Sequence, residues 1–268
     1  MHHENLAKAN GLEFSYHSEG HGPTLVLLHA FPLNKAMWEG QIEALKDACH
    51  VLTMDMRGFG RSQVTDGVFT LDDLADDLHH LLERLGHTQM VLGGLSMGGY
   101  VAMAYMRRHP AGVRGLILAD TKAGADGPEA LAKREAMITD VAAHGTRGVA
   151  RAFPRAVVSA STAETQSALL DRLKGWIEDT APSTVIGAQR AMAARPDSGA
   201  LLPTIAVPTL ILVGEEDPTT PPAEAEAMAA AIPGAQLVRL PGAGHLANLE
   251  APDAFNAAVR TFMAQFRD

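Results

Sequence analysis

The chain has 268 residues, of which 47% are hydrophobic, and its formal net charge is −9. This length and apolar content suffice for one large domain with a buried core, whereas the negative charge disfavours nucleic acid as a partner, because a polyanion would be repelled. Cys49 is the single cysteine, so no intrachain disulfide can form. No run is as continuously apolar as a signal peptide or a membrane span. We therefore expect a soluble, cytoplasmic protein with no membrane partner.

In chain order, short apolar segments alternate with segments of helical periodicity. The predicted strands are 12–16, 24–29, 50–54, 89–95, 113–119, 209–213 and 236–240, and the predicted helices are 37–48, 71–85, 97–109, 222–232 and 252–266. Several of these strands are apolar throughout, which is typical of strands buried on both faces of a parallel sheet. The alternation predicts an α/β fold, a doubly wound and mostly parallel sheet.

One long segment interrupts this alternation between the fifth and sixth predicted strands. It is rich in alanine and charged residues and contains no convincing buried strand. We expect residues 122–202 to form a helical cap inserted into a core domain made of residues 1–121 and 203–268. The cap carries more apolar side chains than a few short helices can bury among themselves, so it should lie over the carboxyl edge of the sheet.

A candidate nucleophile lies between a predicted strand and a predicted helix, in Gly94-Leu95-Ser96-Met97-Gly98. This Gly-x-Ser-x-Gly pattern is that of a sharp strand-to-helix turn, which exposes the serine hydroxyl and leaves no room for side chains two residues before and after it. The start of the following helix supplies N–H groups and partial positive charge for a developing oxyanion.

A serine hydroxyl needs a base, and the base needs an acid that fixes its tautomer. His245 lies in a glycine-rich loop between the last predicted strand and the last predicted helix, near the sheet edge where Ser96 is expected. Asp217 follows the strand 209–213, and the chain order Ser, Asp, His is the one expected for this kind of sheet. It is the preferred acid because its loop also carries the turn signals Gly214 and Pro218. Asp120, which ends the strand 113–119, is the alternative.

The remaining site residues are expected from loops at the same edge. The backbone N–H groups of Phe31 and Met97 are the candidate oxyanion donors, Phe31 lying in the loop after an early strand. We expect five residues to line the substrate pocket: His29, Asp120, Phe153, Trp176 and Leu246. For the His29 side chain the alternative is that it packs inside the loop and hydrogen-bonds it.

These segments together resemble the α/β-hydrolase superfamily over nearly the whole chain outside the cap. The segments that carry the resemblance are 29–32, 55–62, 94–99, 214–217 and 244–245. Within the superfamily the chain resembles the carboxylesterase, enol-lactonase and cofactor-free haloperoxidase or perhydrolase group. Ala30 is a departure, since relatives usually carry glycine there. Ser96 stands where haloalkane dehalogenases and epoxide hydrolases carry aspartate, which argues against both activities.

The expected function is that of a serine hydrolase that splits a small carboxylic ester or lactone through an acyl-enzyme on Ser96. The sequence contains no metal-binding or dinucleotide-binding motif, so neither a metal nor another cofactor is expected. We expect a monomer or a homodimer. The alternatives are a perhydrolase or a carbon–carbon bond hydrolase with the same triad, and a slow-turnover ligand-binding receptor on the same fold.

Overall fold

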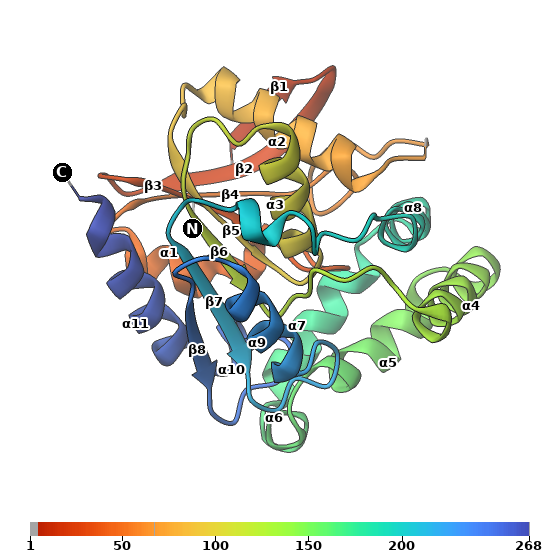
Figure 1. Cartoon of the computed structure of the whole chain (residues 1–268). Coiled ribbons are helices and arrows are strands. Elements are labelled where there is room, and N and C mark those ends of the chain that lie inside the picture. The colour runs from red at the N-terminus through yellow and green to blue at the C-terminus, as the bar shows by residue number, and fades with distance from the viewer. Residues whose placement is uncertain (1–4, 67, 268) are drawn as a thin grey trace.

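The computed structural model describes residues 5–66 and 68–267 and places eight strands of this part of the chain in one sheet (Figure 1). The strands are β1 (Asn5–Ala9), β2 (Leu12–Glu19), β3 (Thr24–Leu28), β4 (His50–Met54), β5 (Met90–Leu95), β6 (Val113–Ala119), β7 (Thr209–Gly214) and β8 (Gln236–Leu240). Their order is β1-β2-β4-β3-β5-β6-β7-β8. The pairs β1–β2 and β2–β4 are antiparallel, whereas all pairs from β4 to β8 are parallel. The predicted mostly parallel sheet is confirmed.

Helices cover both faces of this sheet (Figure 1). The core helices are α1 (Glu39–Leu45), α2 (Leu71–Leu85), α3 (Met97–Arg108), α9 (Pro222–Ala231), α10 (Ala247–Glu250) and α11 (Pro252–Met263), with short 3-10 helices η1 (Lys35–Trp38), η2 (Leu202–Thr204) and η3 (Ala264–Phe266). Helix α1 contacts α11, and α2 contacts α3. The helical layers therefore enclose the sheet. Among the described residues, no helix is both long and apolar enough to span a membrane.

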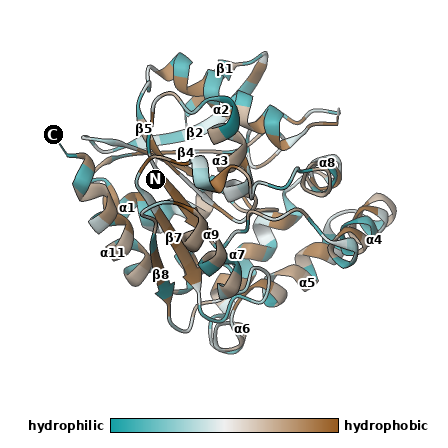
Figure 2. Cartoon of the chain, viewed as in Figure 1, coloured by the Kyte–Doolittle hydropathy of each residue, from teal (hydrophilic) through white to brown (hydrophobic). Residues whose placement is uncertain are grey.

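The central strands form the middle of the hydrophobic core. Every residue of β5 and β7 is buried, and Figure 2 shows hydrophobic colour on the central strands and hydrophilic colour on the outer sides of the helices. Burial on both faces explains why these strands are apolar throughout. Because parallel strands run the same way, the loops that follow them meet at one edge, where a site can be built from distant segments.

Helix α2 begins and ends where local chemistry dictates. Thr70 Oγ1 accepts a hydrogen bond from the Asp73 N–H at 3.1 Å, and the Asp73 carboxylate accepts one from the Thr70 N–H at 2.7 Å. This reciprocal capping satisfies N–H groups that the first turn leaves without helical acceptors. Gly86 ends the helix in the left-handed region, with φ of 79°.

The segment between β6 and β7 folds into helices. These are α4 (Pro128–His144), α5 (Arg147–Val157), α6 (Ala160–Thr165), α7 (Ser167–Glu178) and α8 (Pro182–Ala193). They form a group beside the carboxyl edge of the sheet (Figure 1). We propose residues 122–202 as the bounds of this cap, with residues 1–121 and 203–268 as the core domain.

A buried ion cluster joins the two ends of the cap. The Asp126 carboxylate, just before α4, pairs with the guanidinium groups of Arg134 and Arg195, the latter just after α8. Burial would raise the pKa of Asp126, but the hydrogen bonds and charges of the two arginines lower it well below its usual range. The pairing ties the start of the cap to its end.

The structure adds the short helices α10 and η2 to the sequence-based elements, and it differs from them in two places near the start of the chain. Strand β1 was not expected; it forms the outer antiparallel edge with β2 and has alternating partly buried and exposed residues, which gives a weak signal in so short a segment. The predicted helix 37–48 is divided into η1 and α1. It begins earlier than predicted because Asn34 caps η1 by accepting from the Ala36 N–H at 3.0 Å.

Candidate active site

Ser96 lies at the turn between β5 and α3 with a strained backbone, φ 56° and ψ −114°. A non-glycine residue rarely adopts such a conformation, and it is held here by close packing on both sides. A Cβ atom on Gly94 would overlap the backbone of Gly98, and one on Gly98 would overlap the carbonyl group of Leu28. The two glycines are therefore required for the turn that presents the hydroxyl of Ser96.

His245 joins Ser96 to a carboxylate. Its Nε2 atom lies 2.8 Å from Ser96 Oγ, and its Nδ1 atom lies 2.8 Å from Asp217 Oδ2. His245 and Asp217 are 3% and 4% exposed, whereas Ser96 is partly exposed. This geometry fits a neutral imidazole that donates from Nδ1 to the carboxylate and accepts the serine proton at Nε2.

The Asp217 carboxylate is surrounded by donors. Oδ1 accepts from the N–H groups of Thr219 and Thr220 at 2.7 and 2.9 Å, and Oδ2 accepts from the Thr220 hydroxyl at 2.7 Å. Burial alone would raise the pKa of Asp217, but the hydrogen bond and charge of His245 and the bonds from Thr220 lower it. Asp217 is thus held in the charged form, which can stabilise a protonated His245.

Asp120, the alternative acid, serves a different set of groups. Its Oδ1 accepts from the Gly214 N–H at 2.8 Å and its Oδ2 from the Ala247 N–H at 3.4 Å. Its backbone is in the left-handed region, with φ of 43°. Burial, followed by the charge of Asp217, raises the pKa of Asp120 well above its usual value. Asp120 therefore holds the two loops that carry Asp217 and His245. It was expected to line the substrate pocket, but its side chain is buried.

The candidate oxyanion donors come from two loops beside Ser96. Met97 is the first residue of α3, so its N–H belongs to the first turn, whose N–H groups lack helical acceptors. Phe31 follows β3 and is 6% exposed. Ala30 does not have a positive φ, and its methyl group is fully buried, so the residue fits this loop without backbone strain.

His29 lies in the loop after β3 that carries the candidate donor Phe31, called the oxyanion loop below, and holds it from within the core. Its ring is 0% exposed and packs edge-on against Phe59, with ring centroids 5.0 Å apart. Its Nδ1 atom lies 2.9 Å from the Ala30 carbonyl oxygen. Its Nε2 atom accepts from the Met56 N–H at 3.1 Å. Burial lowers the pKa of His29 to about 4, against the opposing hydrogen bond to Ala30. Of the two alternatives for His29, a pocket side chain or one that packs and hydrogen-bonds its loop, the structure has the second, and the ring joins the loops after β3 and β4.

The cap touches both halves of the site through helix α5. Phe153 packs edge-on against Phe31 with ring centroids 6.1 Å apart, and the Val157 carbonyl accepts from the His245 N–H at 2.8 Å. Glu250 adds a bridge: its carboxylate accepts from the Ser159 N–H at 2.8 Å and from the Leu246 N–H at 3.1 Å. The cap is therefore bonded directly to the loop that carries His245.

The other expected pocket residues are dispersed. Phe153 is partly buried against the oxyanion loop, and Leu246 is 1% exposed within the core. Trp176 lines a cavity of about 460 Å³ whose lining includes none of the triad residues. Of the five residues expected to line one pocket, the structure thus brings Phe153 into contact with the oxyanion loop and places Trp176 at a separate cavity.

Two contributors escaped the sequence-based reasoning. Thr220 lies three residues after Asp217, a spacing at which an aspartate accepts from the following backbone, so a local signal existed. Glu250 had no such signal, because its partners include Ser159 of the cap. Within 5–66 and 68–267, no group of three or more His, Cys, Asp or Glu side chains is arranged to hold a metal ion.

Comparisons with known proteins extend over most of the chain. The family model described as alpha/beta hydrolase fold matches residues 23–252. A thermophilic esterase from Thermogutta terrifontis, solved with malate bound, is 38% identical with a TM-score of 0.94 over 99% of this chain and 100% of that chain. A bromoperoxidase from Bacillus anthracis has a TM-score of 0.89 at 25% identity, over 98% of this chain and 100% of that chain. The 3-oxoadipate enol-lactonase 2 of Acinetobacter baylyi is 26% identical over 99% of this chain and 98% of its own length.

Proposed function

This chain belongs to the α/β-hydrolase fold family, and we propose that it is a serine hydrolase that cleaves a carboxylic ester or lactone of a small organic substrate. The observation that carries the proposal is the unbroken chain of short contacts from Ser96 Oγ through His245 to Asp217. Similarity to an esterase and to an enol-lactonase over nearly the whole chain supports the same bond class.

In the proposed first half-reaction, Ser96 Oγ attacks the substrate carbonyl carbon while its proton passes to His245 Nε2. The carbonyl oxygen becomes an oxyanion, which the N–H groups of Phe31 and Met97 stabilise. His245, now charged, is stabilised by Asp217 and returns the proton to the leaving alkoxide oxygen. The carbon–oxygen ester bond breaks, the alcohol leaves and the acyl group remains on Ser96.

In the second half-reaction, a water molecule gives a proton to His245 Nε2 and attacks the acyl carbon. The same N–H groups stabilise the second oxyanion, which collapses as the proton returns to Ser96 Oγ. A carboxylic acid is released and the serine is regenerated. If hydrogen peroxide replaces water, the product is a peracid; the similarity to a bromoperoxidase makes this the second reaction to test.

The proposal is tested by mixing the protein with p-nitrophenyl acetate. We expect repeated turnover, and Ser96→Ala should lower kcat by about 10⁴- to 10⁶-fold. Ser198→Ala is a control serine variant, because Ser198 is buried, accepts a hydrogen bond from Arg107 and does not contact His245. Hydrogen peroxide is added in a parallel assay for peracid.

Covalent labelling with a fluorophosphonate gives an independent readout. The label should attach to Ser96, persist in Ser198→Ala and disappear in Ser96→Ala. Labelling retained in Ser96→Ala would refute the proposed nucleophile. Stoichiometric release of p-nitrophenol without further turnover would favour a slow-turnover receptor on the same fold over an enzyme.

A further inference from the structure

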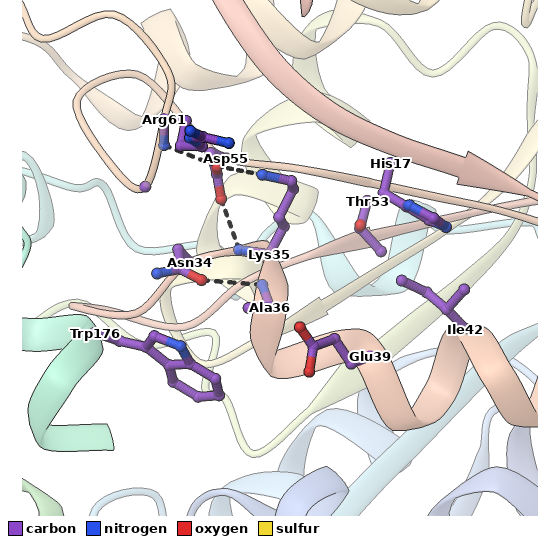
Figure 3. Close-up of a pocket in the computed structure, with 11 residues that line it drawn as sticks. His17, Asn34, Lys35, Ala36, Glu39, Ile42, Thr53, Asp55, Arg61 and Trp176 are labelled. Atoms are coloured by element: carbon purple, nitrogen blue, oxygen red, sulfur yellow. Dashed lines mark hydrogen bonds and ion pairs between the residues drawn. The ribbon is translucent and has the colours of Figure 1, made fainter. Parts of the chain in front are cut away.

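The cavity of about 460 Å³ that Trp176 lines lies apart from the triad and is bordered by residues of η1 and α1 (Figure 3). Its floor includes His17 of β2 and Thr53 of β4, which are direct cross-strand neighbours. Ile42 of α1 forms an apolar wall, and Trp176 reaches the cavity from α7 of the cap. The volume lies within the range of about 300 to 1,000 Å³ that is usual for small-molecule sites.

The sheet face below this cavity is unusually polar for a surface covered by a helix. Ser15, Thr53 and Asp55 are 0%, 0% and 1% exposed, and Lys35 is 8% exposed. Lys35 Nζ donates to Asp55 Oδ2 at 2.7 Å and to Ser15 Oγ at 2.8 Å. A helix-covered sheet face is normally apolar, because buried polar groups cost free energy unless they are bonded. The ion pair is compensated, so the polar face can be maintained around the cavity.

Thr53 is a buried polar side chain at this cavity whose hydroxyl is left without a hydrogen bond by the described part of the chain. Its hydroxyl Oγ1 is fully buried and has no hydrogen-bond partner among the described residues. Such groups are rare in folded proteins because desolvation is expensive. Thr53 belongs to the cavity floor, and a ligand hydroxyl that displaces the side chains covering Oγ1 can supply the missing hydrogen bond.

The charges around the cavity balance. Lys35 and Arg61 are cationic, and Glu39 and Asp55 are anionic. A lining of this kind does not select an ion by its net charge, but it offers both donors and acceptors. Asn34 adds a further donor, because its side-chain oxygen is already used by the Ala36 N–H and its amide nitrogen remains the donating end.

We propose that this cavity binds a neutral polyhydroxylated molecule of about monosaccharide size, at a site separate from Ser96. Hydroxyl groups both donate and accept, so they match a lining of mixed donors and acceptors without requiring a net charge. Trp176 provides an aromatic wall against which the C–H groups of such a ring can pack. The Arg172 guanidinium group lies 5.0 Å from the centre of the Trp176 ring and holds this wall toward Glu39, 3.4 Å away.

The site is tested with glucose as the probe and the Trp176 indole N–H signal as the readout in ¹⁵N-labelled protein. The chain has two tryptophans, so Trp176→Phe assigns the signal. We expect a saturable shift with a Kd in the millimolar range. Thr53→Val keeps the side-chain shape and should weaken binding about 3- to 10-fold, the loss expected for one hydrogen bond. Thr53→Ser, which keeps the hydroxyl, should bind within about twofold of the parent.

Controls separate this site from the active site. Ser96→Ala should bind glucose as the parent does, and glucose should not compete with p-nitrophenyl acetate. Melting temperatures verify that each variant is folded. If Thr53→Val does not fold, Arg61→Ala replaces it, because it removes an exposed side chain at the cavity and should also weaken glucose binding.

Four results would overturn the proposal. These are no saturable shift up to ~100 mM glucose, unchanged binding in folded Thr53→Val, loss of binding in Ser96→Ala, and binding of gluconate or glucosamine about tenfold tighter than that of glucose. The last result would show that the cavity selects an ion. None of them bears on the labelling of Ser96, so the two proposals fail independently.

Discussion

The buried histidine behind the oxyanion loop predicts a specific loss of stability in mild acid. His29 can bond both of its neighbours only when its ring is neutral, because Nε2 must accept from the Met56 N–H while Nδ1 donates to the Ala30 carbonyl oxygen. A proton on Nε2 would place two donors against each other in a fully buried site. Protonation should therefore separate the loop that carries Phe31 from the loop after β4.

The size of the effect follows from the pKa difference between the two states. Burial lowers the pKa of His29 from 6.5 to about 4, so the unfolded chain binds more protons than the folded chain between these values. The contribution of His29 to stability is then complete above pH 6.5 and is lost as the pH falls toward 4. At about 1.4 kcal/mol per pH unit, the loss is about 3 kcal/mol.

The measurement is the free energy of unfolding in urea, for the parent and for His29→Gln, at a series of pH values from 7 to 4. Glutamine has an amide oxygen that can accept from Met56 and does not titrate in this range. We expect the variant to be less stable at pH 7 but to lose about 3 kcal/mol less than the parent on acidification. Carboxylates titrate in both proteins and cancel in the comparison. Parallel pH curves for the two proteins would refute the buried neutral His29.

Further predictions concern the groups around His245. Asp217→Asn should lower kcat about 10³- to 10⁴-fold by favouring the wrong tautomer of His245, whereas Asp120→Asn, which keeps an acceptor for the Gly214 N–H, should change kcat less than about tenfold; the reverse ranking would make Asp120 the acid. Phe153→Ala should reduce kcat/KM by a factor that grows along a series of p-nitrophenyl esters of increasing chain length, because each lost methylene contact costs about 1 to 3 kcal/mol of transition-state binding. A decrease that is uniform along the series would instead indicate a purely structural side chain. Glu250→Gln, which can keep one of two acceptor contacts at full strength, should lower the melting temperature by about 2 to 4 °C for each kcal/mol lost, read by calorimetry; an unchanged melting temperature would show that the bridge contributes nothing.

Features that depend on near neighbours in the chain could be predicted from the sequence. The glycines at 94 and 98 are required by contacts within the turn and with the adjacent strand end, so the pattern alone indicated the position of Ser96. The start of α2 depends on Thr70 and Asp73, three residues apart. The loops that carry Asp217 and His245 each follow a strand, and parallel strands bring such loops to one edge.

Features that depend on contacts across the chain could not be predicted. Asp120 and, as one of two alternatives, His29 were expected in the pocket, but strand position does not reveal which way a side chain points. The imidazole of His29 accepts from the Met56 N–H. The carboxylate of Asp120 accepts from the N–H groups of Gly214 and Ala247. Residue type and strand order placed them correctly along the edge, and only the folded loops determine what they hold.

The same limit applies to Trp176, expected beside Phe153 in one apolar pocket. Helices α5 and α7 pack against each other, yet the two rings reach different places. Phe153 contacts Phe31, whereas Trp176 lines the cavity above Thr53. Which side of the oxyanion loop a cap residue reaches depends on helix orientation, which amphipathic periodicity does not encode.

Helix α5 makes the cap part of the proposed catalytic geometry. Phe153 and Val157 are four residues apart and therefore lie on one face of the helix, where one packs against Phe31 and the other accepts from the His245 N–H. A single turn of α5, which contains Pro154, joins the two residues, so the separation between the loop that carries Phe31 and the loop that carries His245 is coupled to the position of the cap. Movement of α5 away from the core would break the bond to His245 at the same time as it opened the apolar surface beside Phe31. Because substrate contact and base placement share one helix, displacement of α5 should change kcat and KM together.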